Sequence, residues 1–139
     1  MTALDVKVAA ARAAGALSRR AGRGGTSLPG KFLMRLEPHA SRCVRAGEVH
    51  ELLTTDHQGT APGTRIDRVA FLGFAEIGRA GVIDRGDMVW IGGRPVGTVL
   101  GFDACHFPNH YNIIIHTREP RTGADLGLAP EVEILFEPG

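Results

Sequence analysis

The sequence predicts an all-β fold, a small barrel of about six strands with an N-terminal helical arm. Three observations favour it. Glycine accounts for 19 of the 139 residues and proline for 8, which favours turns and short strands over a helical bundle. Gly92-Gly93 separates two apolar runs and is a strong hairpin signal. Residues 131–138 alternate between apolar and mostly acidic side chains, as a strand with one buried face does.

The N-terminal third differs from the remainder. We expect residues 1–40 to form a basic helical arm with a Gly/Pro linker, and residues 41–139 to form the barrel domain. Residues 3–21 are rich in Ala, a strong helix former, and glycines end the pattern. Residues 22–31 are interpreted as the Gly/Pro linker. The short apolar run at 31–37, which ends before Pro38, is compatible with more than one type of element.

Short predicted strands follow one another from about residue 41. They comprise a strand or strand pair at 43–56 with a turn at Ala46-Gly47, a largely buried strand at 65–77, strands at 87–93 and 94–102, a β-branched strand at 111–117 and the last strand at 131–138. Gly-rich turns at this spacing are typical of a small barrel or sandwich.

Length and composition place limits on the protein. A chain of 139 residues with 43% hydrophobic and 22% charged residues is typical of one soluble globular domain. Its apolar runs all fall short of the roughly 20 residues that span a bilayer. The first residues do not have the continuous apolar stretch of a signal peptide, so we expect a cytoplasmic protein. Cys43 and Cys105 are then expected to be free thiols.

The net charge is +1, but the charges are unevenly distributed. Residues 1–45 carry nine Lys or Arg against two acids, a charge of +7, whereas residues 46–139 carry −6. A basic arm on an acidic body fits contact with nucleic acid or an anionic surface. Aromatic residues do not interleave the basic ones before Phe32, which favours docking of the arm on its own body or on a sister subunit over nucleic acid. A homodimer is the default expectation for so small a barrel.

A phosphate-loop pattern occurs in the linker. The stretch 25–32, GTSLPGKF, has the spacing of Gly25, Gly30 and Lys31. The motif requires a Ser or Thr after the lysine to hold magnesium, but Phe32 stands there, and Pro29 removes an amide donor. A flexible linker is therefore the favoured interpretation.

Histidine and cysteine residues cluster in the body. Cys105, His106 and His110 lie within six residues, and imidazole and thiolate suit zinc or iron. The spacing matches no standard zinc finger, so a catalytic site without metal and a structural role both stay open. In the structural alternative His116 faces solvent on an edge strand. In the catalytic alternative Cys105 beside His106 is a candidate activated thiolate.

Two stretches resemble known bacterial families. Residues 59–138, through GTAPGTRIDRVAFLGF, AGVIDRGDMVWIGGRPVGTVLGFDA, HYNIII and EVEILFEP, resemble the glucitol/sorbitol-specific IIA component of the phosphotransferase system. The resemblance implies a small closed β-barrel. Aligned on Gly81 and Gly86, the phosphoacceptor histidine of that family falls at Phe74 and its cysteine at Phe71, so neither is present. Residues 16–38, ALSRRAGRGGTSLPGKFLMRLEP, resemble the N-terminal leader of the Mur-ligase-type subunit of lipid II isoglutaminyl synthase.

These patterns together lead us to expect a repurposed barrel that binds or acts on a small polar metabolite through a His/Cys/carboxylate pocket. One alternative is a non-enzymatic accessory protein that docks a partner through residues 1–40, and a further one is a IIA-like phosphocarrier. The expected catalytic residues are His106, His110, Cys105 and Asp103, with His106, His110 and Cys105 as metal ligands. The expected ligand-binding residues are His50, His57, Glu51, Asn109 and Tyr111.

Overall fold

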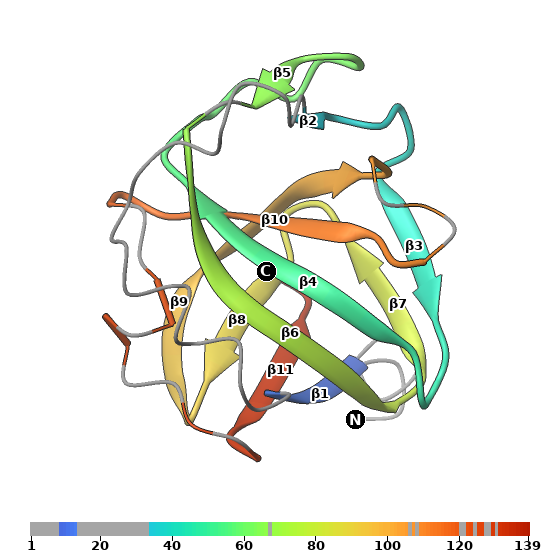
Figure 1. Cartoon of the computed structure of the whole chain (residues 1–139), viewed down its shortest axis with the longest axis vertical. Coiled ribbons are helices and arrows are strands. Elements are labelled where there is room, and N and C mark those ends of the chain that lie inside the picture. The colour runs from blue at the N-terminus through green and yellow to red at the C-terminus, as the bar shows by residue number, and fades with distance from the viewer. Residues whose placement is uncertain are drawn as a thin grey trace.

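The computed structural model describes residues 9–13, 34–66, 68–105, 107, 109–119, 122–123, 125–126, 129 and 131–139. The regular structure of these residues is entirely β-strand, as predicted for the part after residue 40 (Figure 1). The strands are β1 (Ala9–Ala13), β2 (Met34–Arg35), β3 (Ser41–Val44), β4 (Val49–Thr55), β5 (Arg65–Ile66), β6 (Val69–Arg79), β7 (Gly81–Asp84), β8 (Met88–Ile91), β9 (Arg94–Asp103), β10 (Asn112–His116) and β11 (Glu133–Glu137).

Seven strands form the main sheet. From residue 34 onward, six strands in the order β11-β8-β9-β10-β4-β6 make an open sheet with β11 and β6 at its edges. Strand β1 lies between those edges and pairs with both, so that the sheet closes on itself. All neighbours are antiparallel except β10 and β4. We call this sheet the seven-stranded ring.

The prediction of a six-stranded barrel with a helical arm was wrong. Six strands alone leave the sheet open, and the strand that fills the gap, β1, comes from the segment expected to be helical. Alanine prefers a helix by less than about 1 kcal/mol per residue over most other types. Two unpaired strand edges offer backbone hydrogen bonds on both sides of β1, and this tertiary pairing outweighs the local preference. The remainder of residues 1–33, including the phosphate-loop pattern, lies outside the described residues.

Turn signals in the sequence identified two reversals correctly. Gly92 and Gly93 have φ values of 58° and 81° and join β8 to β9 as a tight hairpin. Both residues need positive φ in such a turn, which glycine adopts without a steric cost. Gly47, at φ 93°, turns the chain between β3 and β4. These two strands do not pair with each other, since β3 pairs with β7 instead.

The sheet is buried on both faces along β4 and β10. Inside the ring, Ile113 and Ile115 pack with Leu52, Leu72 and Phe136 in one hydrophobic cluster. Outside it, alternate residues of the same strands, including Leu53 and Ile114, pack under β2 and β5 in a second cluster. Consecutive apolar residues in these strands therefore reflect burial on two faces.

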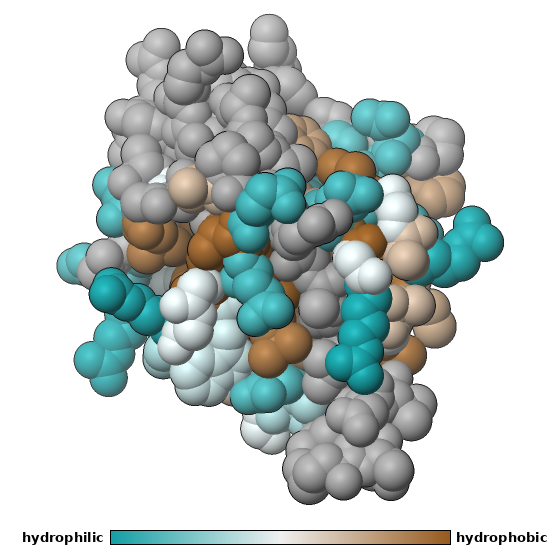
Figure 2. Space-filling view, turned by 90° about the horizontal axis from the view of Figure 1, so that it is seen from below, coloured by the Kyte–Doolittle hydropathy of each residue, from teal (hydrophilic) through white to brown (hydrophobic). Residues whose placement is uncertain are grey.

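The surface of the described residues carries few large hydrophobic side chains. Only Val49 and Phe107 among them are exposed, at 42% and 57%. In the view from below Figure 1, hydrophobic and hydrophilic groups alternate rather than form one continuous apolar patch (Figure 2). Within the described part of the chain, no helix is long and apolar enough to cross a lipid bilayer.

Candidate functional site

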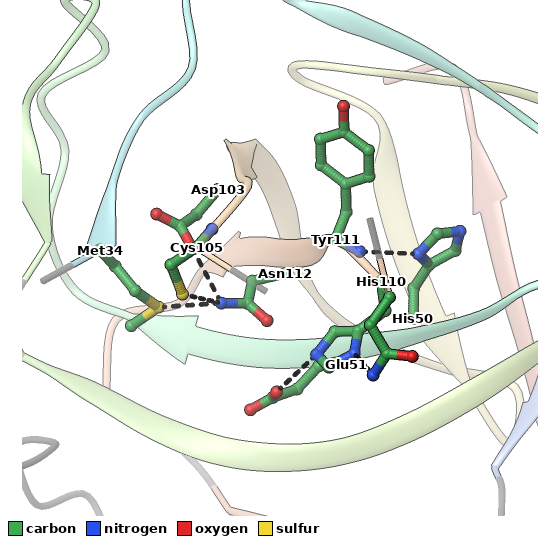
Figure 3. A network of polar contacts seen from close by, with 9 residues as sticks. Met34, His50, Glu51, Asp103, Cys105, His110, Tyr111 and Asn112 are labelled. Carbon is green, nitrogen blue, oxygen red and sulfur yellow. Dashed lines mark hydrogen bonds and ion pairs between the residues drawn. The ribbon is translucent and has the colours of Figure 1, made fainter. Parts of the chain in front are cut away.

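A row of polar side chains crosses one end of the sheet. Strand pairing aligns Asp103 at the end of β9 with Asn112 at the start of β10, and Asn112 with Glu51 of β4. Their chain neighbours Phe102, Ile113 and Leu52 face the inner cluster, so these three side chains lie on the outer face of the sheet. Figure 3 shows them with the residues around them. We call Asp103, Asn112 and Glu51 the polar row.

The carboxylate of Asp103 connects three segments of the chain through hydrogen bonds. It accepts hydrogen bonds from the Arg35 backbone N–H at 2.7 Å, from the Cys105 backbone N–H at 3.0 Å and from Asn112 Nδ2 at 3.0 Å. The residue is 2% exposed. A carboxylate in such a place is stable only when its oxygens are hydrogen-bonded, and here both are. Asp103 therefore acts first as an anchor between β2, β9 and β10.

Asn112 has one satisfied and one unsatisfied end. Its Nδ2 donates to Asp103 and also lies 3.3 Å from Cys105 Sγ and 3.4 Å from Met34 Sδ. The acceptor-only carboxylate fixes which end of the amide faces it. The amide oxygen, Oδ1, is buried and has no hydrogen-bond partner. It points away from Asp103, Cys105 and Met34 (Figure 3). An unsatisfied buried acceptor of this kind costs about 1–3 kcal/mol unless water or a bound molecule donates to it.

Next along the row, Glu51 is paired with His110. Glu51 Oε1 lies 3.2 Å from His110 Nε2, and the two side chains are only 13% and 10% exposed. The side-chain amide of the exposed Asn109 lies 3.2 Å from His110 Nδ1. A carboxylate at Nε2 holds the proton there, which makes Nδ1 the acceptor nitrogen. The same imidazole and the ring of Phe74, on β6, meet edge to face, with ring centroids 5.2 Å apart.

His50 and Tyr111 lie on the other side of the same strands (Figure 3). His50 is 3% exposed; its Nδ1 accepts the Tyr111 backbone N–H at 3.1 Å, and its Nε2 lies 2.9 Å from Glu48 Oε1. Burial lowers the pKa of His50 from its usual value, and the hydrogen bond and charge of Glu48 oppose it only in part. Partial burial is the largest single effect on Glu48 and acts to raise its pKa. The hydrogen bonds from His50 and the Arg45 backbone, with the charges of His50 and Arg42, together outweigh it and lower the pKa.

Tyr111 is covered by a cation. The guanidinium carbon of Arg42, on β3, lies 3.7 Å from the centre of the Tyr111 ring. Such a contact is worth about 0.5–2 kcal/mol. His39 meets the same ring edge-on, with centroids 6.0 Å apart, and stacks on Phe102. These contacts attach β3 to the start of β10 and hold the Tyr111 ring in place.

Cys105 does not have the character of an activated nucleophile. Loss of water around the sulfur, followed by the hydrogen bond and charge of Asp103, raises the pKa of its thiol to about 12. The thiol is therefore protonated at neutral pH, whereas nucleophilic cysteines have lowered pKa values. In this setting Cys105 is a hydrogen-bonding neighbour of Asn112.

The structure brings most of the predicted site residues to one end of the sheet but divides them. Asp103, Cys105, Asn109, His110 and Glu51 gather around the polar row, whereas His50 and Tyr111 lie behind it.

Three further histidines were singled out in the sequence. His57 follows the opposite end of β4, and His106 lies outside the described residues. His116 ends β10 between β4 and β9, so the expectation of an edge strand was wrong. In the part of the chain that is described, no group of three or more His, Cys, Asp or Glu side chains is arranged to hold a metal ion.

Sequence reasoning missed two residues of this region. Asn112 is a polar residue directly before three isoleucines, and a polar side chain in so apolar a strand is a usable signal of a buried hydrogen-bond network. Arg42 offered no comparable signal, because it is far from Tyr111 in the sequence and only the tertiary structure brings the two together.

Comparison with known proteins places the chain in a family. No curated protein and no solved structure matches it. Residues 30–137 match a family described as "Family of unknown function (DUF6917)". This match spans all the strands of the ring except β1, together with the whole polar row. The chain therefore belongs to the family of unknown function DUF6917.

Proposed function

We propose that this protein binds a small polar molecule at the polar row. One observation carries the proposal: the buried amide oxygen of Asn112 has no donor. Most buried polar groups in proteins are hydrogen-bonded, so such an atom marks a place for a water or ligand donor. The molecule that fits must bring an O–H or N–H group to this oxygen.

Two groups near Asn112 also favour a ligand that donates hydrogen bonds. Glu51 accepts hydrogen bonds, and His110 Nδ1 is an acceptor while Glu51 holds the proton on Nε2. The Asn109 amide that now donates to Nδ1 belongs to an exposed side chain, and a ligand donor can replace it. Three acceptors along one row favour a compound with several donors, such as a polyol, a sugar or an amino sugar. Proton abstraction by His110 Nδ1 from a bound hydroxyl is the chemistry that this pairing supports.

Thermal unfolding in the presence of polyols, hexoses, pentoses and amino sugars tests the proposal. We expect at least one compound to raise the melting temperature of the wild type by RT ln(1 + [L]/Kd) divided by the unfolding entropy. His110→Ala and Glu51→Gln should abolish the shift. His57→Ala is the matched control, because it removes a histidine beyond the opposite end of β4. A cooperative unfolding transition of each variant without ligand checks that it is folded. If no compound binds, or if binding survives both variants, the proposal fails.

A second candidate, a IIA-like phosphocarrier, is favoured by the contact between Phe74 and His110. The resemblance aligns Phe74 with the phosphoacceptor histidine, and the His110 ring lies against Phe74 at 5.2 Å. His110 would then carry the phosphoryl group in place of the missing side chain. Incubation with labelled phosphoenolpyruvate and the general phosphotransfer proteins should label the wild type and not His110→Ala. An unlabelled wild type would exclude this candidate.

A further inference from the structure

A hollow lies at the opposite end of β10 from the polar row. It has a volume of about 690 Å³ and is lined from the β8–β9 turn and from the segment that follows β10. Small-molecule sites usually measure about 300–1,000 Å³. Asn112 begins β10 at the polar row, whereas Thr117, which lines the hollow, follows its last residue. The two places are thus separated by the length of a strand.

The floor of the hollow is apolar. Ile91, at the end of β8, is 8% exposed and belongs to the hydrophobic cluster inside the ring. Val96 and Leu126 are partly buried and pack against the same cluster. The floor is therefore the accessible end of the inner core. An apolar body placed there is stabilised because its surface and that of the floor are removed from water.

Charged side chains surround this floor. Arg94, Arg118 and Glu119 all line the hollow and are exposed. Among the residues that the structure describes, none of these three forms an ion pair. The two guanidinium groups of the lining are therefore without an ion-pair partner among the described residues.

The remaining carboxylate of the lining, Asp125, is already engaged. Its Oδ2 accepts the Thr122 backbone N–H at 3.0 Å, while the Thr122 hydroxyl accepts the Asp125 backbone N–H at 3.0 Å. This reciprocal pair orients the carboxylate toward its own turn and away from a role as partner of the arginines. Guanidinium groups bind carboxylates and phosphates through paired N–H donors.

We propose that this hollow binds an organic anion with an apolar body, with the anionic group at Arg94 and Arg118 and the body on Ile91, Val96 and Leu126. The proposal concerns a different site and a different ligand chemistry from the polar row. Either one can fail without affecting the other.

Calorimetric titration of the full chain with decanoate, below its micelle concentration, tests the proposal. Decanoate supplies both the anionic group and the apolar body. We expect measurable binding of decanoate, at least about tenfold weaker binding of decanol, and no measurable binding of acetate. Decylamine, which reverses the charge, should bind at least about tenfold more weakly than decanoate.

Variants identify the residues responsible. Arg94→Gln combined with Arg118→Gln removes both guanidinium groups and should weaken decanoate binding at least about tenfold. Both positions are exposed and tolerate a neutral side chain, so the double variant should fold. Arg65→Gln removes an exposed guanidinium on β5 and should leave binding unchanged. His110→Ala, at the polar row, should also have no effect. Absent decanoate binding, unchanged binding in the double variant, or equally tight binding of decanol or decylamine would overturn the proposal.

Discussion

Asp103→Asn is the most informative single substitution, because it changes charge and hydrogen bonding while keeping the shape of the side chain. The two carboxylate oxygens accept three N–H donors, from Arg35, Cys105 and Asn112. An amide has only one oxygen, and its NH₂ group must take the place of the other. If the oxygen keeps Cys105 and Asn112, the NH₂ faces the Arg35 N–H, donor against donor.

The cost follows from these contacts. A hydrogen bond to a charged group contributes about 1.5–3 kcal/mol, and a buried donor left without an acceptor costs about 1–3 kcal/mol. Asp103 is 2% exposed, so water does not replace the lost acceptor easily. We expect the free energy of unfolding to fall by about 3 kcal/mol, a large share of the roughly 5–15 kcal/mol typical of a domain.

Urea unfolding measures this loss. With a slope of about 1.5 kcal/mol per molar urea, the midpoint should fall by about 2 M at an unchanged slope. Glu133→Gln, at an exposed position of β11, is the control and should stay within about 0.5 kcal/mol of the wild type. If Asp103→Asn also stays within that range, Asp103 does not anchor the polar row and our account of the network is wrong.

Three further predictions concern protonation, reactivity and the first strand. Because burial lowers the pKa of His50, the unfolded chain takes up a proton there at higher pH than the folded chain. The unfolding free energy should therefore fall as the pH drops below about 6.5, and it should fall less in His50→Gln. Urea unfolding at several pH values measures it, and an equal fall in the wild type and the variant would contradict this prediction. With a thiol pKa of about 12, Cys105 should react with iodoacetamide at pH 8 about a hundredfold more slowly than free cysteine. Mass spectrometry of the Cys43→Ser variant follows this reaction, and a rate equal to that of free cysteine would refute the raised pKa. Ala11→Pro removes a backbone N–H from β1, between β6 and β11, and should lower the unfolding free energy by about 2 kcal/mol, whereas Ala11→Ser keeps the N–H and should not.

Strand prediction succeeded where local chemistry dominates. Gly92-Gly93 marks a hairpin because its two positive φ angles are cheap only for glycine, and the alternating C-terminal run buries Ile134 and Phe136 on one face. It failed at β1 and at the pairing of β3, since both depend on partners more than 30 residues away in sequence. A run of alanines gives no local signal that the unpaired edges of β6 and β11 will bind it as a strand.

The candidate site was predictable as a set of residues but not as an arrangement. Clustered histidines and acids indicated Glu51, Asp103, Cys105 and His110, and these do gather around one row. The face on which each side chain lies depends on strand register, because a shift of one residue exchanges the two faces. The alternation of a strand separates His50 from Glu51 in any register, but which of the two lies inside the ring was not determined by the sequence.

The sequence by itself determined that this protein is made of short β-strands, where two of its turns fall and which polar residues are concentrated near the start of β10. These properties depend on neighbours along the chain, through backbone sterics and the two-residue period of a strand. The tertiary structure alone decided that β1 completes the ring, that Asn112 is left with an unsatisfied oxygen, and that Arg94 and Arg118 border an apolar hollow. Each of these depends on hydrogen bonds and contacts between segments far apart in sequence, for which residue type gives no local signal.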